Sequence, residues 1–417
     1  MKKTFLIIII FTLIILNIGS CKDPIFFNIS EEIEPNDPKI SGSPTKFAVS
    51  GNFLWVASGK SLWRYSKTVD TGWCVCARDK KGNLPSCTCG RRYDMQFWIR
   101  DITATETYLY LCMEDSNGKG VIRRMNYSSS PAQYEDIIIP SENADAQSIF
   151  ALDKILFFSA MFVKDEKISY SYYFAEEPDS MSTLISVSEQ PRLTMLNGIA
   201  FSGGCYYLCS MNGLYYMTLG GEAVKIPGTT LDEARNRNGF TGIININDKV
   251  AAISRSGNLL NVTNENITPI ANFQIKRNVS TGALAVWYEL EYDGDGAVKQ
   301  DENGKAITVA ALLLAGRQDR IDYTDTTEFT HGYVELKVNP DGNVASTEFL
   351  EPGNQSPSSV DSHSRFKSSL GPNTINHIIQ TPYEIDNERT LFASTHQGGV
   401  FSYRKNQRGE WYWNAEE

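Results

Sequence analysis

The stretch FLWVASGKSLWRYS, residues 53–66, contains a short apolar strand, a turn with a glycine, and a second strand rich in aromatic residues. The same unit recurs along the chain with turns of different length. Copies with short turns are YYLCSMNGLYYMTL (206–219), VAAISRSGNLLNVT (250–263) and TLFASTHQGGVFSYR (390–404), and copies with longer turns occupy 109–126, 155–174 and 309–338. Recurrence of one hairpin through the whole body predicts a repeat architecture.

A further apolar segment precedes each hairpin, and another candidate strand follows it, such as GWCVC (72–76) or GEWYW (409–413). Units of three or four strands that use up the chain are typical of a β-propeller, whose radial sheets have only short protected edges. We therefore predict an all-β fold. Residues 46–417 should form a single β-propeller, best counted as seven blades of four-stranded antiparallel sheets within a range of six to eight.

Two rival architectures fit the sequence less well. A parallel α/β fold needs long helical patterns between its strands, and the one clear helix start is TTLDEAR (229–235), where Thr230 and Glu233 have capping-box spacing. A pair of β-sandwiches would need a linker near the middle of the chain, and the sequence has none there.

The charge of the chain bears on its partners. The formal net charge is −10 and the chain has 39 Lys and Arg residues, with no concentrated basic stretch. Binding of nucleic acid depends on a basic face that neutralises phosphates. We therefore expect no nucleic-acid partner.

The N-terminus has the features of an export signal. Lys2 and Lys3 precede an apolar run from Phe5 to Leu16, and small residues follow. This pattern predicts a signal peptide over 1–20 that is cleaved off. The alternative is an uncleaved membrane anchor, since the run is only slightly shorter than a bilayer span.

The tetrad Ile18-Gly19-Ser20-Cys21 resembles the lipobox of bacterial lipoproteins. The resemblance implies that Cys21 becomes the acylated first residue, with palmitate among its chains, and holds an exported protein on a bacterial membrane at the periplasmic face or the cell surface. More than one acyl chain is needed for stable attachment. The Pro-containing residues 21–45 then form a flexible tether.

The hairpin copies resemble the propeller repeats of bacterial sensor ectodomains. Leu54-Trp55, Gly59, Leu62-Trp63 and Tyr65 match that pattern best, and Phe392, Gly398-Gly399, Phe401 and Tyr403 match it in part. The sixth unit departs from it through a long acidic insertion. The Trp-Asp dipeptide of WD repeats and the Asp-box of sialidases are absent, so the functions of those families do not transfer. Together with the signal, the chain looks like a spirochaete-type propeller lipoprotein.

Four cysteines form two Cys-x-Cys pairs, Cys74 with Cys76 and Cys87 with Cys89. On a strand such pairs share a face, so paired strands would bring four sulfurs together. Two cross-strand disulfides suit an exported protein. A structural zinc site is the disfavoured alternative, because Cys-x-Cys is a tighter bite than the usual Cys-x₂-Cys. Free or reactive thiols are a third alternative, and we expect no cofactor.

The other cysteines, Cys112, Cys205 and Cys209, lie in apolar strand patterns and are expected to be buried small hydrophobic residues. Seven cysteines remain after Cys21, so at least one must stay unpaired or bind something.

An acidic segment, 292–305, contains Asp293, Asp295 and Asp301. It does not fit the EF-hand calcium loop, because Val298 stands where that loop has Gly and Gly304 where it has Glu. We interpret it as a solvated hairpin loop. A second charged run, Arg317, Asp319 and Arg320, is equally well explained as a surface turn. Both are candidate binding loops.

All four histidines, His331, His363, His377 and His396, lie in the last 90 residues. His377 and His396 could approach the channel of a propeller, but no spacing among the four supports metal ligation.

The sequence favours a binding or scaffolding module over an enzyme. No phosphate loop, nucleophile elbow or zinc-protease motif appears. Connecting loops on a rigid scaffold commonly carry function, so the loops 291–305, 317–332 and 351–374 are candidate contacts for a protein or glycan partner of the envelope. The alternative is a hydrolase or lyase that acts on an extracellular polymer, with paired carboxylates at the channel mouth. A structural lipoprotein of an envelope machine is a third hypothesis.

Overall fold

The computed structural model describes residues 40–416 with gaps. The residues outside the description are 1–39, 41, 52, 67–72, 75–86, 88, 128–132, 138–143, 165–166, 177–184, 189–194, 220, 230–238, 255–257, 273–278, 292, 296, 305–307, 317–332, 340, 350–374, 386–387, 397, 406–410 and 417. The predicted signal peptide, Cys21, most of the tether and the capping box at 230–233 therefore lie outside the described residues.

In the described part of the chain, the strands form seven four-stranded antiparallel sheets, which we number in chain order. Sheet 1 contains β1 (Ala48–Ser50), β2 (Phe53–Ser58), β3 (Ser61–Ser66) and β4 (Arg92–Asp94), and sheet 2 contains β5 (Ile99–Ala104), β6 (Leu109–Glu114), β7 (Gly120–Asn126) and β8 (Gln133–Ile137). Sheet 3 contains β9 (Asp145–Leu152), β10 (Ile155–Lys164), β11 (Lys167–Glu176) and β12 (Ile185–Ser188), and sheet 4 contains β13 (Leu196–Ser202), β14 (Cys205–Ser210), β15 (Gly213–Met217) and β16 (Val224–Lys225).

Sheet 5 contains β17 (Phe240–Ile246), β18 (Lys249–Ser254), β19 (Asn258–Val262) and β20 (Ile267–Asn272), and sheet 6 contains β21 (Val279–Leu290), β22 (Thr308–Gly316), β23 (Tyr333–Val338) and β24 (Val344–Phe349). Sheet 7 contains β25 (Ile375–Ile385), β26 (Glu388–Thr395), β27 (Gly399–Lys405) and β28 (Trp411–Ala415). In each sheet the strands are hydrogen-bonded in chain order, from an inner first strand to an outer fourth strand.

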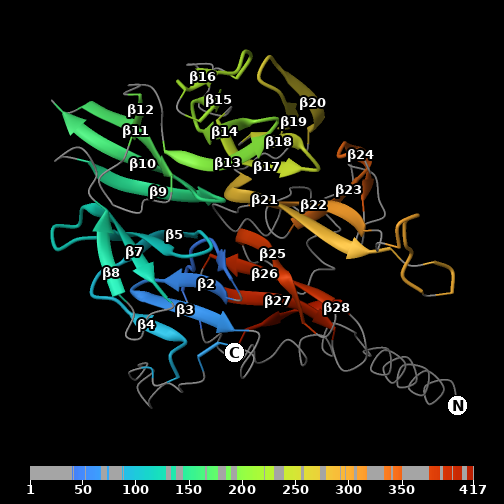
Figure 1. Ribbon diagram of the computed structural model, residues 1–417, viewed down its shortest axis with the longest axis horizontal. Helices are drawn as coiled ribbons and strands as arrows, with labels where there is room; N and C mark the ends of the chain where they lie inside the picture. Colours follow the sequence, from blue (N-terminus) through green and yellow to red (C-terminus); the bar gives the residue numbers. More distant parts are fainter. Residues whose placement is uncertain are drawn as a thin grey trace, which may run out of the picture.

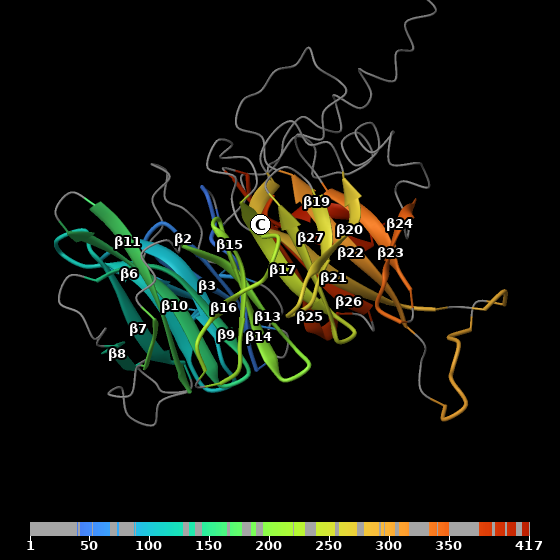
Figure 2. The ribbon, with the colours of Figure 1, turned by 90° about the horizontal axis from the view of Figure 1, so that it is seen from above.

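The sheets follow one another around a ring, with the first strand of each nearest the centre (Figure 1). Seen from the side, the ring is a thick disc with the strands crossing it from face to face (Figure 2). These observations confirm the predicted all-β class and a single propeller of four-stranded antiparallel sheets.

The core lies between neighbouring sheets. Between sheets 2 and 3, for example, Tyr110, Cys112, Phe158 and Tyr173 form part of one buried cluster. Successive side chains of a strand point to opposite faces of its sheet. The apolar side chains on each face are removed from water only when they pack against the neighbouring sheet. Burial of the apolar repeat is therefore what holds the ring together.

The ring closes where sheet 1 meets sheet 7. Gly42 pairs with Gly398 in a parallel bridge, and the side-chain amide of Asn376 donates to the backbone oxygen of Pro44 at 3.1 Å. Phe392 of β26 is fully buried and lies beside Tyr65 of β3, with ring centroids 5.3 Å apart. We call this contact the seam.

One predicted strand is wrong. Trp73 and Cys74 of GWCVC are not in a strand, and β4 at Arg92–Asp94 is the fourth strand of sheet 1. Trp73 instead packs into the seam, beside Tyr65 at 5.4 Å. Burial of a large aromatic side chain is strongly favourable, and this explains why Trp73 packs in the seam and does not continue the sheet. The corresponding segment of sheet 7 does form its strand, β28.

Replacement of Gly120 by alanine is expected to lower the free energy of unfolding by about 1 to 3 kcal/mol, the range for overpacking a close contact. A Cβ atom at Gly120 would lie 2.0 Å from the backbone oxygen of Ala146 in the neighbouring sheet. Sheets 2 and 3 would have to separate to admit it. Gly294, where a Cβ meets nothing within 4 Å, is the control. Urea denaturation of both alanine variants measures the difference, and equal stability would contradict the close approach.

Candidate functional site

A cavity of about 650 Å³ lies on the axis of the ring. Its lining comes from the inner strands of all seven sheets and from residues 44–47, which precede β1. The polar side chains of the lining include Lys46, Arg100, Asp101, Gln147, Asn197 and His377. This is the axial channel of the propeller.

Lys46 connects three sheets within this channel. Its ammonium group donates to the carboxylate of Asp101 in β5 at 2.6 Å and to the backbone oxygen of Ile149 in β9. It also lies over the ring of Phe150, 3.6 Å from the centroid. Burial lowers the pKa of Lys46, although the neighbouring Asp101 raises it. Asp101 is the one carboxylate among the described lining residues, and it also accepts a hydrogen bond from the amide of Ile149 at 3.0 Å.

His377 faces the channel from β25 and accepts a hydrogen bond at Nδ1 from the amide of Phe47, at 3.3 Å. That bond crosses the seam. Burial, with a contribution from the charge of Lys46, lowers the pKa of His377 to about 3. The imidazole is therefore neutral at physiological pH, and His396 contacts Ser43 at a separate place. The two described histidines do not form a ligand pair.

Stability is expected to fall as the pH drops below about 6.5, because the unfolded state binds a proton on His377 that the folded state does not accept. The folded pKa of about 3 would give about 2 kcal/mol between pH 7 and pH 5. His377 is only partly buried, so screening by channel water reduces our expectation to about 1 kcal/mol. The H377N variant keeps an acceptor and does not titrate, so its denaturation midpoint should change less with pH. An unchanged pH profile in H377N would contradict the assignment.

An ion pair joins sheets 2 and 3 at the point where their inner strands, β5 and β9, begin. Arg100 of β5 lies 2.7 Å from Asp145 of β9 and donates to the backbone oxygen of Gly118 at 2.8 Å. We call the face at which the inner strands begin the entry face.

Three large apolar side chains are exposed on the entry face. Trp98, just before β5, is 56% exposed, and Val163 and Ile168 are each 60% exposed. Val163 and Ile168 are register partners at the end of the β10–β11 hairpin, beyond Met161, which pairs with Asp145, the first residue of β9. The hairpin therefore extends past its inner neighbour. These residues were not predicted from the sequence, and the signal that could have found them is the length of this hairpin.

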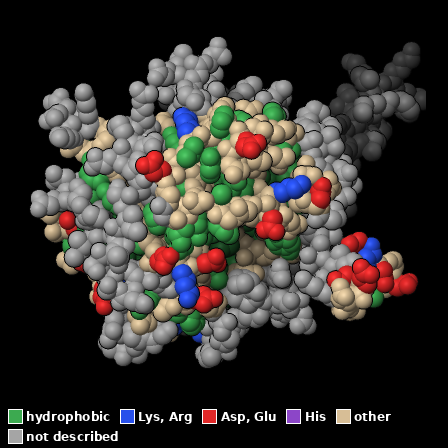
Figure 3. Space-filling model, turned by 45° about the horizontal axis from the view of Figure 1, so that its top comes forward, with side chains coloured by type: hydrophobic (Ala, Val, Ile, Leu, Met, Phe, Trp, Pro, Cys, Tyr) green, Lys and Arg blue, Asp and Glu red, His purple; other side chains and the backbone are tan. Residues whose placement is uncertain are grey.

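The acidic candidate loop is described in part. Asp293 accepts hydrogen bonds from the amides of Asp295 at 3.0 Å and Ala297 at 2.8 Å, and Asp301 accepts one from Asn303 at 2.9 Å. These carboxylates cap turns of their own backbone. The segment projects from the ring (Figures 1 and 2), and on the face seen in Figure 3 acidic side chains gather on a part that stands away from the body.

Several predicted residues cannot be placed. Cys76 and the charged run Arg317, Asp319 and Arg320 lie outside the described residues, as do the loops 317–332 and 351–374. Among the described residues, no helix is long and apolar enough to span a membrane.

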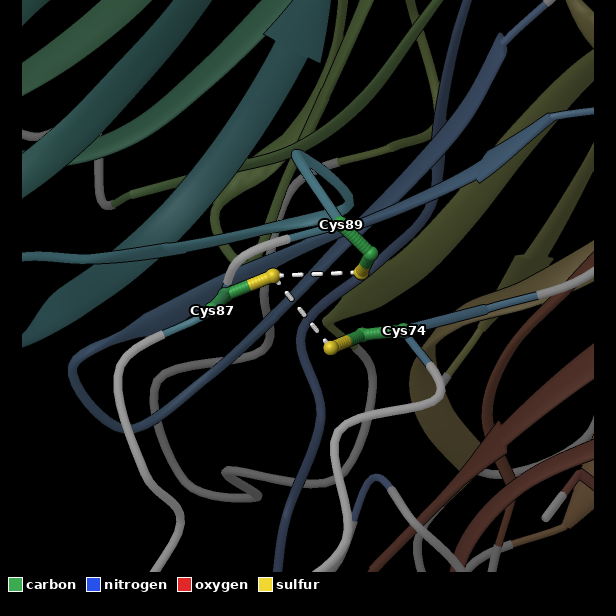
Figure 4. Close-up of side chains that lie close together, drawn as sticks. All are labelled: Cys74, Cys87 and Cys89. Carbon is green, nitrogen blue, oxygen red and sulfur yellow. Dashed lines mark hydrogen bonds between the residues drawn. The ribbon is translucent and has the colours of Figure 1, made fainter.

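Three of the four clustered cysteines are described, and they converge (Figure 4). The sulfur of Cys87 lies 3.3 Å from that of Cys74 and 3.2 Å from that of Cys89. These separations exceed the S–S bond length of about 2.05 Å, so no disulfide joins Cys87 to Cys74 or to Cys89. The predicted disulfides are therefore not formed between described cysteines. None of the three lies in a strand, so the sulfurs do not meet through the strand pairing that the sequence predicted.

The surroundings of the cluster favour a thiolate. Burial opposes ionisation of Cys87, but hydrogen bonds from the other two thiols and from the amides of Arg91 and Arg92 lower its pKa. Cys74 is fully buried in the seam core, whereas Cys87 and Cys89 are partly exposed. By contrast, burial raises the pKa of Cys112 and of Cys209. These two are buried as predicted, while Cys205 is partly exposed.

Known proteins resemble this chain weakly, and in structure alone. No family model and no curated protein matches the sequence. The solved structure of YCF48 bound to D1 peptide has 11% identity and a TM-score of 0.46, over 90% of this chain and 96% of that chain. PorZ, a surface component of the type-IX secretion system of Porphyromonas gingivalis, has 7% identity and a TM-score of 0.47, over 90% of this chain and 39% of that chain.

The extracellular domain of a one-component system, BT4673 from B. thetaiotaomicron, has 13% identity and a TM-score of 0.45, over 89% of this chain and 40% of that chain. The chain thus spans about two fifths of the length of PorZ and of BT4673. At these identities and TM-scores the likeness supports no statement about the function of this chain.

Proposed function

We propose that the protein is a lipid-anchored envelope lipoprotein whose propeller binds a protein partner at the entry face. The observation that carries this proposal is the exposure of Trp98, Val163 and Ile168 on that face. Large apolar and aromatic side chains are the residues that supply most of the energy at protein interfaces. Exposure of apolar area to water is unfavourable, so a partner that covers these side chains is stabilised by their burial.

Several contacts hold Trp98 and the backbone beside it in place. Arg100 ties the start of β5 to Asp145 at the start of β9, and the backbone oxygen of Trp98 accepts a hydrogen bond from the amide of Glu114 at 2.9 Å. The aromatic ring of Trp98 lies against Gly59, where a Cβ atom would come within 3.2 Å of it. Side chains fixed before binding lose less conformational entropy when a partner covers them.

In-cell photo-crosslinking is the experiment that tests the binding proposal. A photoreactive amino acid is placed at 98, 163 or 168 in separate variants, and at 219 as the control, because Leu219 is also exposed, at 46%, but lies at the opposite end of the strands. We expect the same discrete protein adduct from the three entry-face positions and not from 219. Adducts from 219 alone, or none from the entry face, would contradict the proposal.

Anchoring is tested separately at Cys21, the lipidation residue implied by the lipobox. Mass spectrometry of the N-terminal peptide from the mature protein should show an acylated cysteine, and C21A should leave the membrane fraction. Removal of all acyl chains eliminates an attachment to which each buried methylene contributes about 0.8 kcal/mol. A C21A variant that stays membrane-bound would favour the uncleaved anchor instead.

A further inference from the structure

We propose that Cys74, Cys87 and Cys89 form a binding site for one zinc ion, which fixes the β3–β4 connection to the seam of the ring. This inference concerns a structural site and is independent of the partner at the entry face. It also reverses the preference that the sequence gives to disulfides.

The sulfur geometry is the first argument. The ligand atoms of the three cysteines all lie within 4.8 Å of one another. Zinc with thiolate ligands at about 2.3 Å keeps tetrahedral sulfurs about 3.8 Å apart, so small side-chain rotations are sufficient to admit the ion. A disulfide between any two would require an approach to about 2.05 Å and would leave the third sulfur beside it without a role.

The backbone around the cluster is the second argument. Gly90 follows Cys89 with a φ of 67°, a conformation that favours glycine. The chain turns there and directs the amides of Arg91 and Arg92 to the sulfur of Cys87. Hydrogen bonds from outer groups orient metal ligands and tune their basicity. A free thiol requires no such arrangement.

The charges near the cluster are the third argument. Three thiolates and one Zn²⁺ carry a net charge of −1, and binding releases three thiol protons to solvent. Arg91 donates to the backbone oxygen of Trp73, directly before Cys74, at 3.2 Å, and the side chain of the next residue, Arg92, is fully buried with its guanidinium over the ring of Trp63. The guanidinium also pairs with Asp94 at 2.9 Å. A cationic side chain thus already stands where the loaded site would be anionic.

The position of the site shows what the ion would do. Trp73, directly before Cys74, packs on Tyr65 of sheet 1. It also packs on Phe392 of sheet 7, with the ring centroids 6.2 Å apart. An ion held by Cys74, Cys87 and Cys89 would join the start and the end of the β3–β4 connection and keep Trp73 in the seam. The partly exposed Cys87 and Cys89 leave a route by which the ion enters. A water molecule can complete the tetrahedron.

The test uses the full mature chain in detergent, reduced without oxygen. Titration with Zn²⁺ against a chromogenic chelator should give one ion per chain, and Co²⁺ should give the absorption of a tetrahedral site with three thiolates. C74S, C87S and C89S should each weaken Zn²⁺ binding on the order of 100-fold, because each removes a ligand. C205S, which changes a partly exposed cysteine outside the cluster, should bind as the wild type does.

Thermal unfolding gives a second readout. Zn²⁺ should raise the Tm of the wild type, since an ion that binds only the folded state stabilises it, and a chelator should reverse the rise. The Tm of C87S should not rise with Zn²⁺. If C87S does not fold, the reversible change in the Tm of the wild type is the deciding measurement. The proposal is overturned if the wild type binds no zinc at micromolar concentration, if the three variants bind like C205S, or if protein extracted from envelopes has a disulfide between two of the three cysteines.

Discussion

Asp101→Ala is expected to destabilise the protein by about 3 kcal/mol, the low end of the range for breaking a buried ion pair. The change leaves the ammonium group of Lys46 without its carboxylate partner, while both side chains are at most 17% exposed. The amide of Ile149 also loses its acceptor on Asp101. Three neighbouring sheets meet at this point, so the loss should be seen in global unfolding. Urea denaturation followed by tryptophan fluorescence measures it.

The double variant K46M/D101L is the matched control. Replacement of both charges by apolar side chains of similar size removes the unpaired charge, and such exchanges are often neutral or stabilising. We therefore expect K46M/D101L to be more stable than D101A, although the donor to Ile149 is also removed. If both variants lost the same stability, the ion pair would not be the cause, and the packing around Phe150 would be the better explanation.

Phe392→Ala is expected to lower the free energy of unfolding by about 3 to 5 kcal/mol, the usual result of truncating a buried aromatic residue. Phe392 contacts Tyr65, Trp73 and Phe47 with ring centroids 5.3 to 6.2 Å apart. Three of these four rings belong to the N-terminal part of the chain, so the cavity would open in the seam. Differential scanning calorimetry of the variant measures the change.

Phe201→Ala provides the comparison for Phe392→Ala. Phe201 is 39% exposed, and its main ring contact is Tyr206 at 4.8 Å. Truncation there should lower the free energy of unfolding by only about 1 kcal/mol, because a large part of the side chain is already in water. A similar loss in both variants would indicate that the seam is no more important to stability than the surface.

The fold could be predicted from the sequence because the local pattern of each repeat predicts its own hairpin. FLWVASGKSLWRYS becomes β2 and β3 with the turn at Gly59, whose φ of 62° suits glycine. Hairpins of this kind depend on local pattern and turn chemistry, both of which are read directly from residues. The fourth strands are shorter and less regular, and Trp73 and Cys74, within the strand expected at 72–76, are not in a strand.

The sites were less accessible, because they depend on contacts between distant segments. Lys46 and Asp101 are 55 positions apart, and His377 receives its hydrogen bond from Phe47, 330 positions away. No local pattern marks such pairs. The cysteine cluster was visible from its spacing, but the sequence assigned it to paired strands, and the turn at Gly90 that directs amides to Cys87 was not foreseen.

The exposed side chains on the entry face illustrate the same limit. Val163 and Ile168 alternate with their neighbours as strand residues do, and the sequence indicates only that one face of the strand is buried. Their exposure follows from β10 extending past the first residue of β9. That register is set by the pairing of whole strands and not by the hairpin alone.

Closure of the ring at the seam is the central claim, because the channel, the entry face and the cysteine cluster all depend on it. Hydrogen exchange of the full chain, read by mass spectrometry on peptides that cover 42–51 and 389–396, tests it most directly. We predict that the amides of both peptides exchange only through global unfolding and therefore at similarly slow rates. The outer strand β8 (Gln133–Ile137) should exchange faster. Fast exchange of 42–51 with slow exchange of 389–396 would show an open ring and contradict the account.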